Sequence, residues 1–100
     1  MNIAPDDIRK EQRMNGGRYS YRFSDGSEAE MIYVADQPEV AIMTHTYTPP
    51  RHRGQGVAAQ LVALAVSDFR REHRKLVPSC WFARQEFSKH PEWSDLLHRQ

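Results

Sequence analysis

The sequence is poor in cysteine, in long apolar runs and in net charge. Cys80 is the single cysteine, so the chain cannot close an intramolecular disulfide or build a zinc site from several thiolates. No apolar run approaches the ~20 residues that a bilayer crossing needs, and residues 1–7 lack the basic start and apolar stretch of a secretion signal. We therefore expect a soluble, cytoplasmic protein that is not bound to a membrane.

The charges nearly cancel, because 14 Lys and Arg face 13 Asp and Glu. A formal net charge of +1 argues against a surface devoted to nucleic acid. The basic run at residues 70–75 could form a local nucleic-acid patch, but cations at the end of a helix also suit the negative pole of its dipole. The second interpretation is the commoner one.

The 100 residues are enough for one hydrophobic core. Hydrophobic residues make up 39% of the chain and 10% of it is aromatic, which a disordered chain would not show. We expect one domain over residues 1–100, as a monomer or a weak dimer.

The first half of the chain has the patterns of β-strands. Residues 18–23 alternate aromatic and polar side chains, residues 28–34 are rich in β-forming types, and residues 24–27 between them have turn chemistry. These segments predict a hairpin. Ahead of it, residues 7–14 fit either a polar edge strand or a short helix.

The second half predicts a strand, a helix and a further strand. Residues 39–47 are apolar on both faces until Thr44, and residues 56–73 carry apolar side chains at helical spacing. Residues 76–82 fit a final strand, which makes a βαβ unit with the two strands parallel. Short helices over residues 83–89 and from Pro91 onward complete the chain. The expected fold is mixed α/β: an antiparallel meander continuing into a βαβ unit, with one long central helix on a mixed sheet.

A basic loop with two glycines, residues 49–59, joins the strand to the helix of this unit. Gly54 and Gly56 let the backbone approach a ligand without a Cβ in the way, and the first N–H groups of the helix favour an anion. Parallel sheets bind ligands beyond the carboxyl ends of their strands, where this loop lies. The loop therefore predicts a diphosphate site. A plain tight turn with solvated arginines is the structural alternative.

The spacing Gly54-x-Gly56-x-x-Ala59 formally fits the dinucleotide fingerprint. That interpretation fails, because prolines and basic residues separate the strand from the glycines and the strand at 76–82 has no acidic residue to hold a ribose.

The same loop, read as Arg51-x-x-Gly54-x-Gly56, resembles the pyrophosphate loop of the GNAT superfamily, the acetyl-CoA-dependent N-acetyltransferases. The similarity extends over roughly residues 18–97. It includes His45-Thr46 at the end of a strand, Pro78-x-Cys80, and the motif His-Pro-Glu-Trp at residues 90–93, and it points to a compact branch of the superfamily.

The resemblance implies acetyl-CoA, or a related acyl-CoA, as cosubstrate and an unidentified amine as acceptor, either a small molecule or a lysine or N-terminus of a protein. It implies that backbone N–H groups of about residues 53–58 hold the diphosphate and that the pantetheine arm runs between the strand ending near Thr46 and the strand with Cys80. The implied coenzyme-binding residues are Thr46, Arg51, His52, Arg53, Gly54, Gln55, Gly56, Val57 and Ala58.

His45 and Cys80 are the candidate catalytic residues. An imidazole can accept a proton at neutral pH, and a thiol can donate a proton or act as a nucleophile. The resemblance implies that both act, by an acyl-cysteine or by direct transfer. Taken alone, His45 could be a strand-end histidine bonded to backbone, and Cys80 a small buried group.

Many members of the superfamily carry a tyrosine after the last core strand as proton donor, whereas this chain has Trp81 and Phe82 there. Cys80 or His45 would have to take that role. The remaining histidines show no helical i, i+4 pair, so no metal site is expected. The alternative function is a non-catalytic module that binds coenzyme A or senses acyl-CoA.

Overall fold

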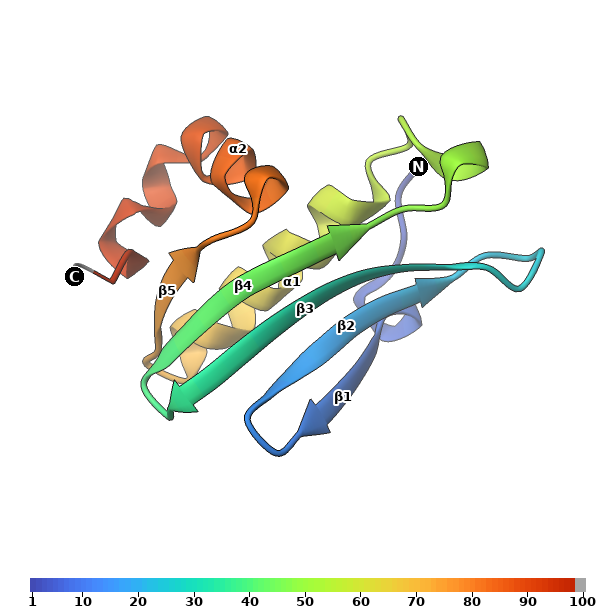
Figure 1. Ribbon diagram of the computed structural model, residues 1–100. Coiled ribbons are helices and arrows are strands. Elements are labelled where there is room, and N and C mark those ends of the chain that lie inside the picture. Colours follow the sequence, from blue (N-terminus) through green and yellow to red (C-terminus); the bar gives the residue numbers. More distant parts are fainter. Residues whose placement is uncertain (99–100) are drawn as a thin grey trace.

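A computed structural model describes residues 1–98 of the chain. It contains a five-stranded sheet in the order β1-β2-β3-β4-β5, with the long helix α1 covering one face and α2 beside the β5 edge (Figure 1). The strands are β1 (Arg9–Arg13), β2 (Gly16–Arg22), β3 (Glu28–Gln37), β4 (Val40–Tyr47) and β5 (Lys75–Pro78). The helices are η1 (Pro5–Asp7), η2 (Pro50–His52), α1 (Val57–Arg71), α2 (Trp81–Lys89) and η3 (Pro91–Leu96).

The first four strands form an antiparallel meander, and β4 and β5 are parallel partners joined through α1. This confirms the predicted mixed α/β fold with its βαβ unit. The segment left open at residues 7–14 is an edge strand, β1, preceded by one 3-10 turn. Its side chains are mostly exposed, as its polar composition requires.

The hydrophobic core lies between α1 and the sheet. The apolar side of α1 contributes Leu61, Ala65 and Phe69, all nearly inaccessible to solvent, and these face Met31 and Met43 of the central strands. The helical spacing read from the sequence therefore identified the buried face of α1 correctly. Within residues 1–98, no helix combines the length and the apolarity that a membrane crossing requires.

The predicted strand at residues 76–82 is wrong in its second half. Strand β5 ends at Pro78, and Trp81 and Phe82 are the first residues of α2. The N–H groups of Ser79 and Cys80 both donate to the carbonyl of Met43 at 3.0 Å, which turns the chain out of the sheet. The Cys80 sulfur then accepts a hydrogen bond from the Ala83 N–H at 3.3 Å and caps the helix. These hydrogen bonds outweigh the β-propensity of the two aromatic residues.

A β-bulge in β4 determines which way His45 faces. Met43 lies opposite Tyr33 and His45 lies opposite Ile32, so Thr44 is an extra residue in β4. Directly opposite residues share a face of the sheet, which places His45 with Ile32 on the face away from α1. Strict alternation from Met43 would have turned His45 toward the helix.

Candidate functional site

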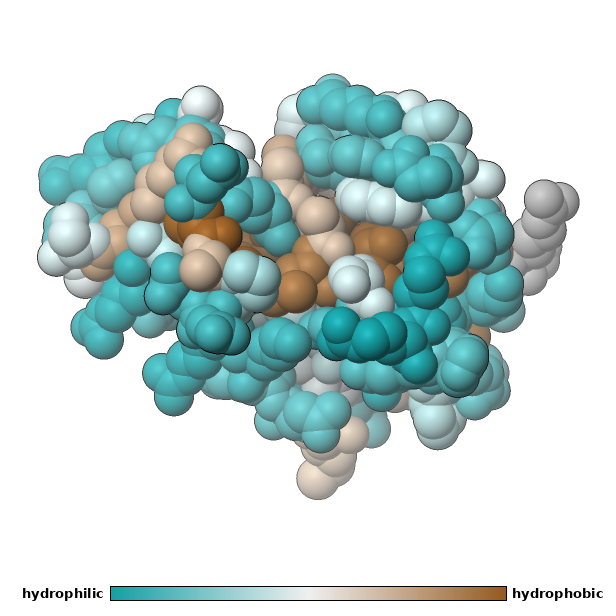
Figure 2. All heavy atoms as spheres, turned by 180° about the vertical axis from the view of Figure 1, so that it is seen from behind, coloured by the Kyte–Doolittle hydropathy of each residue, from teal (hydrophilic) through white to brown (hydrophobic). Residues whose placement is uncertain are grey.

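Strand β4 extends past its neighbour β5, and a pocket lies where they separate. Their pairing ends at Met43 and Pro78, and from there the two ribbons diverge in Figure 1. A cavity of about 350 Å³ lies at this end of the strands, lined by Thr46, Tyr47, Thr48, Arg53, Ala58, Trp81 and Phe82. Figure 2 shows the molecule from the α1 side. A notch in its upper edge separates the part formed by α2 from the part formed by the loop before α1. The carboxyl end of parallel strands is where such folds bind ligands.

The backbone at the start of α1 has free hydrogen-bond donors. Gly56, the N-cap residue, has φ of 78° and provides no side-chain cap, and Gly54 has φ of 84°. Within the described part of the chain, the N–H groups of residues 54–59 donate to no other backbone or side-chain group. A Cβ added at either glycine would meet nothing within 4 Å, so the glycines are required by their positive φ rather than by crowding. The helix dipole adds positive potential at this point.

Arg53 provides the cation among the residues that line the pocket. Its Nε donates to the carbonyl of Thr48 at 3.0 Å, which bends the side chain across the loop toward the end of β4. Thr46 and Ala58 line the pocket as well, one from each side of the βα junction. The structure therefore gathers three of the predicted coenzyme-binding residues around one cavity.

Arg51 and His52 have their side chains engaged elsewhere. Both contact Asp25 in the turn between β2 and β3, with Arg51 Nη1 at 3.3 Å and His52 Nε2 at 2.9 Å from its Oδ2. The His52 ring also stacks on Phe23, with the ring centroids 3.8 Å apart. Hydrogen bonds from Ser27 and His52 hold the pKa of Asp25 well below its ordinary value, so the carboxylate stays charged. These contacts brace the loop against the hairpin, and neither side chain lines the pocket.

Two other predicted residues contribute through the backbone. The Val57 side chain is buried in the core, so only its N–H faces the loop. The Gln55 carbonyl accepts a hydrogen bond of 3.0 Å from the amino group of Met1. Ile3 donates to the side chain of Gln60 at 2.9 Å, so the first residues of the chain lie along the start of α1.

His45 and Cys80 lie on the two sides of the gap between β4 and β5. His45 Nε2 is 3.3 Å from Glu30 Oε2 and the imidazole is half exposed, whereas Cys80 is partly buried at the start of α2. No hydrogen bond joins their side chains, and neither lines the pocket. Backbone contact brings them near, because the Cys80 N–H bonds to Met43, two residues before His45.

Part of the pocket wall was not predicted from the sequence. Tyr47 and Trp81 are exposed aromatic residues that line the pocket from β4 and from α2. Phe82 and Thr48 complete the wall. Trp81 and Phe82 were noted in the sequence, but they were predicted to lie in a strand. Their place at the start of α2, beside the pocket, was therefore not expected.

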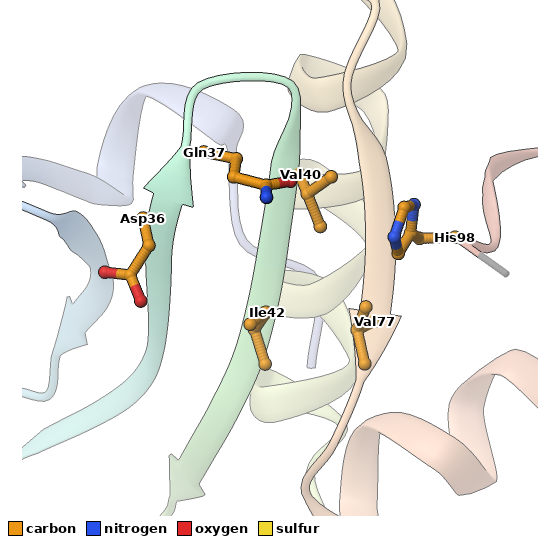
Figure 3. Close-up of a pocket in the computed structure, with 6 residues that line it drawn as sticks. All are labelled: Asp36, Gln37, Val40, Ile42, Val77 and His98. Atoms are coloured by element: carbon orange, nitrogen blue, oxygen red, sulfur yellow. The ribbon is translucent and has the colours of Figure 1, made fainter. Parts of the chain in front are cut away.

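A second cavity, of about 220 Å³, lies at the opposite end of the sheet and is lined by Asp36, Gln37, Val40, Ile42, Val77 and His98. Figure 3 shows Ile42 and Val77 projecting side by side from β4 and β5, with His98 beside β5. It lies near the amino ends of the parallel strands, far from the glycine loop and from the free N–H groups. It is therefore a weaker candidate for the site.

Two comparisons with known proteins bear on the family and the fold. Residues 18–96 match the model of a family described as GCN5-related N-acetyl-transferase. The fold is similar to that of a GCN5-like protein from Staphylococcus aureus, determined by NMR in solution, with a TM-score of 0.70 and 22% sequence identity. The similarity covers 94% of this chain and 91% of that chain.

Proposed function

Since the chain belongs to the GCN5-related N-acetyltransferase family, we propose that it binds acetyl-CoA, or a related acyl-CoA, beside α1 and transfers the acyl group to an amine. The observation that carries the proposal is the run of free N–H groups at residues 54–59, next to a pocket between β4 and α2. The acceptor is a small amine or a lysine or N-terminus of a protein.

In this proposal the loop before α1 binds the diphosphate. The N–H groups of residues 54–59 donate to phosphate oxygens, and the glycines keep the backbone free of side chains at that point. Arg53 adds a positive charge at the pocket. The pantetheine arm then enters the pocket and brings the thioester to the gap between β4 and β5.

In this proposal both His45 and Cys80 take part in the chemistry. The neutral acceptor amine attacks the thioester carbon, a C–N bond forms and the C–S bond breaks. His45 takes the proton from the amine, and the thiol of Cys80 is placed to give one to the departing thiolate or to carry the acyl group itself. Backbone N–H groups of residues 44–46, beyond the end of β5, are candidates for the oxyanion donors.

Acetyl-CoA binding is expected to raise the melting temperature. A ligand at about 100 times its Kd stabilises the folded state by about 2.7 kcal/mol, which for a domain of this size is a shift of roughly 10 °C. Thermal unfolding with and without millimolar acetyl-CoA measures the shift in melting temperature. The control is S-acetyl-N-acetylcysteamine, which has the thioester arm but no diphosphate and is expected to leave the transition unchanged. Absence of a shift with acetyl-CoA would contradict the proposal.

Turnover is expected to require both His45 and Cys80. The assay uses acetyl-CoA with Nα-blocked lysine, spermidine and a short peptide with a free N-terminus as acceptors. His45→Ala should lower kcat by about 100-fold, in the range of general-base catalysis. Cys80→Ser keeps an oxygen cap on α2, so a loss of turnover in that variant reports chemistry rather than unfolding.

An acetyl group on Cys80 in the mass spectrum of the wild-type protein distinguishes the acyl-cysteine route from direct transfer. Binding of acetyl-CoA without turnover of any acceptor supports the non-catalytic coenzyme A-binding module instead.

A further inference from the structure

A cluster of charged residues covers the outer face of the sheet, the face away from α1. Arg18 is its centre. Its guanidinium reaches Glu30 at 2.6 Å, Glu28 at 2.7 Å and Glu11 at 3.1 Å. Arg18 is 14% exposed, so these pairs are partly withdrawn from solvent and better ordered than pairs between free surface chains.

Glu30 connects this cluster to His45. Its Oε1 accepts from Arg18 Nε, and its Oε2 lies 3.3 Å from Nε2 of the imidazole. The two oxygens of one carboxylate thus have different partners, and Arg18 determines where the second oxygen points. Glu28 pairs with Arg18 in the same way but, among residues 1–98, forms no ion pair with a histidine.

The pairing of Glu30 with Nε2 has a consequence for the proton on the ring. A neutral imidazole has one N–H and one nitrogen with a free lone pair, and a carboxylate favours the N–H on the nitrogen that it faces. With Nε2 at 3.3 Å from Glu30, the tautomer that the carboxylate favours has its lone pair on Nδ1. Nδ1 is then the atom of His45 that can accept a proton.

The pocket reaches the same face of the sheet. Tyr47 lies directly opposite Glu30 across β3 and β4 and also lines the pocket, whereas Thr46, opposite Met31, lines it from the helix side. The pocket therefore extends around the end of β4 toward the face that carries His45. An acceptor amine can approach His45 from this face.

Resting on the proposed function, we propose that Glu30 is a positioning residue for acyl transfer: it holds His45 at Nε2 so that Nδ1 accepts the proton of the attacking amine. In the step itself the nitrogen–carbon bond forms, the carbon–sulfur bond breaks, the proton moves to Nδ1 and the sulfur leaves as thiolate. The carboxylate of Glu30 faces the imidazolium that results and stabilises it.

Glu30→Gln tests this role, and Glu28→Gln is the matched control because both variants remove one carboxylate from Arg18. With acetyl-CoA and the best amine of the panel above, Glu30→Gln is expected to lower kcat by about ten-fold or more, with the KM for acetyl-CoA unchanged. Glu28→Gln should stay within about two-fold of wild type. In Glu30→Asp the shorter side chain still pairs with Arg18 but no longer reaches His45. We expect this variant to lower kcat about as much as Glu30→Gln does.

A double-mutant cycle distinguishes positioning from a general structural effect. If Glu30 acts through His45, Glu30→Gln has no further effect on kcat in the His45→Gln background. Independent effects of the two substitutions, or equal kcat for Glu30→Gln and Glu28→Gln, overturn the inference while the proposed function stands. A wild-type protein that turns over no amine overturns the proposed function and this inference together.

Discussion

Ala58→Glu is expected to weaken acetyl-CoA binding by about 100-fold or more without unfolding the protein. Ala58 lines the pocket within the first turn of α1, among the N–H groups that we propose bind the diphosphate. A glutamate there fills part of the cavity and places a negative charge beside a negative ligand. Two like charges about 4 Å apart near a protein surface repel by up to about 4 kcal/mol, more than a 100-fold loss requires.

The helix should tolerate this change, because an acidic side chain in the first turn interacts favourably with the dipole by about 0.3–1 kcal/mol. Ala63→Glu is the matched control. It places the same charge on the exposed side of α1, beyond the N–H groups of residues 54–59, and Ala63 does not line the pocket. Isothermal titration with acetyl-CoA gives the Kd of each variant, and circular dichroism checks the fold. Equal Kd values for the two variants would show that the coenzyme binds elsewhere.

Asp68→Ala is expected to lower the free energy of unfolding by about 3 kcal/mol, because it removes the common partner of three side chains. Asp68 lies on α1 with its side chain 3% exposed. Its Oδ2 accepts from the Tyr19 hydroxyl and contacts Lys10 Nζ, each at 2.7 Å, and its Oδ1 contacts Arg71. Without the carboxylate, the hydroxyl of buried Tyr19 loses its acceptor. Lys10 is half exposed and can be solvated, which keeps the cost at the lower end of the range for buried pairs.

This contribution to stability depends on pH. Burial by itself raises the pKa of Asp68, but the contacts with Lys10 and Tyr19 outweigh burial and hold the pKa below its ordinary value. A carboxyl group whose pKa is lower in the folded state stabilises the protein above its unfolded pKa of about 4, and this stabilisation is lost as the pH falls through the folded pKa.

Urea unfolding at pH 7 and at pH 3 measures the effect. The difference between wild type and Asp68→Ala should be larger at pH 7 and should shrink at pH 3. Asp95→Ala removes an exposed carboxylate that pairs with Arg70, and is expected to change stability much less at either pH. A difference that is the same at both pH values would mean that the charge of Asp68 contributes nothing.

The sequence predicted those features that depend on local pattern. The helical period over residues 57–71 and the alternation in the hairpin are local, and both describe the structure well. The glycine loop was identifiable because positive φ and free N–H groups at a helix start are properties of a short segment. The end of β5 was not identifiable from the sequence, because the hydrogen bonds that Ser79 and Cys80 make to Met43 and Ala83 oppose the β-propensity of Trp81 and Phe82.

The site itself depends on contacts between distant parts of the chain. Asp25 engages Arg51 and His52 across the β2–β3 turn, and the sequence carries no signal for that pairing. The approach of Glu30 to His45 depends on the register of β3 against β4. A register shift by one residue exchanges the faces of a strand, so such contacts become visible only once the pairing is known.

The extra residue in β4 decides on which face of the sheet His45 lies. An even number of steps separates Met43 from His45, yet their side chains lie on opposite faces because the bulge absorbs one step. If Thr44 instead paired regularly with Ile32, His45 would lie opposite Met31 and face α1, and Thr46 would lie opposite Glu30 in its place. Loss of the bulge, with every proposed catalytic side chain still present in the sequence, would thus exchange the inner and outer surfaces of the strand end.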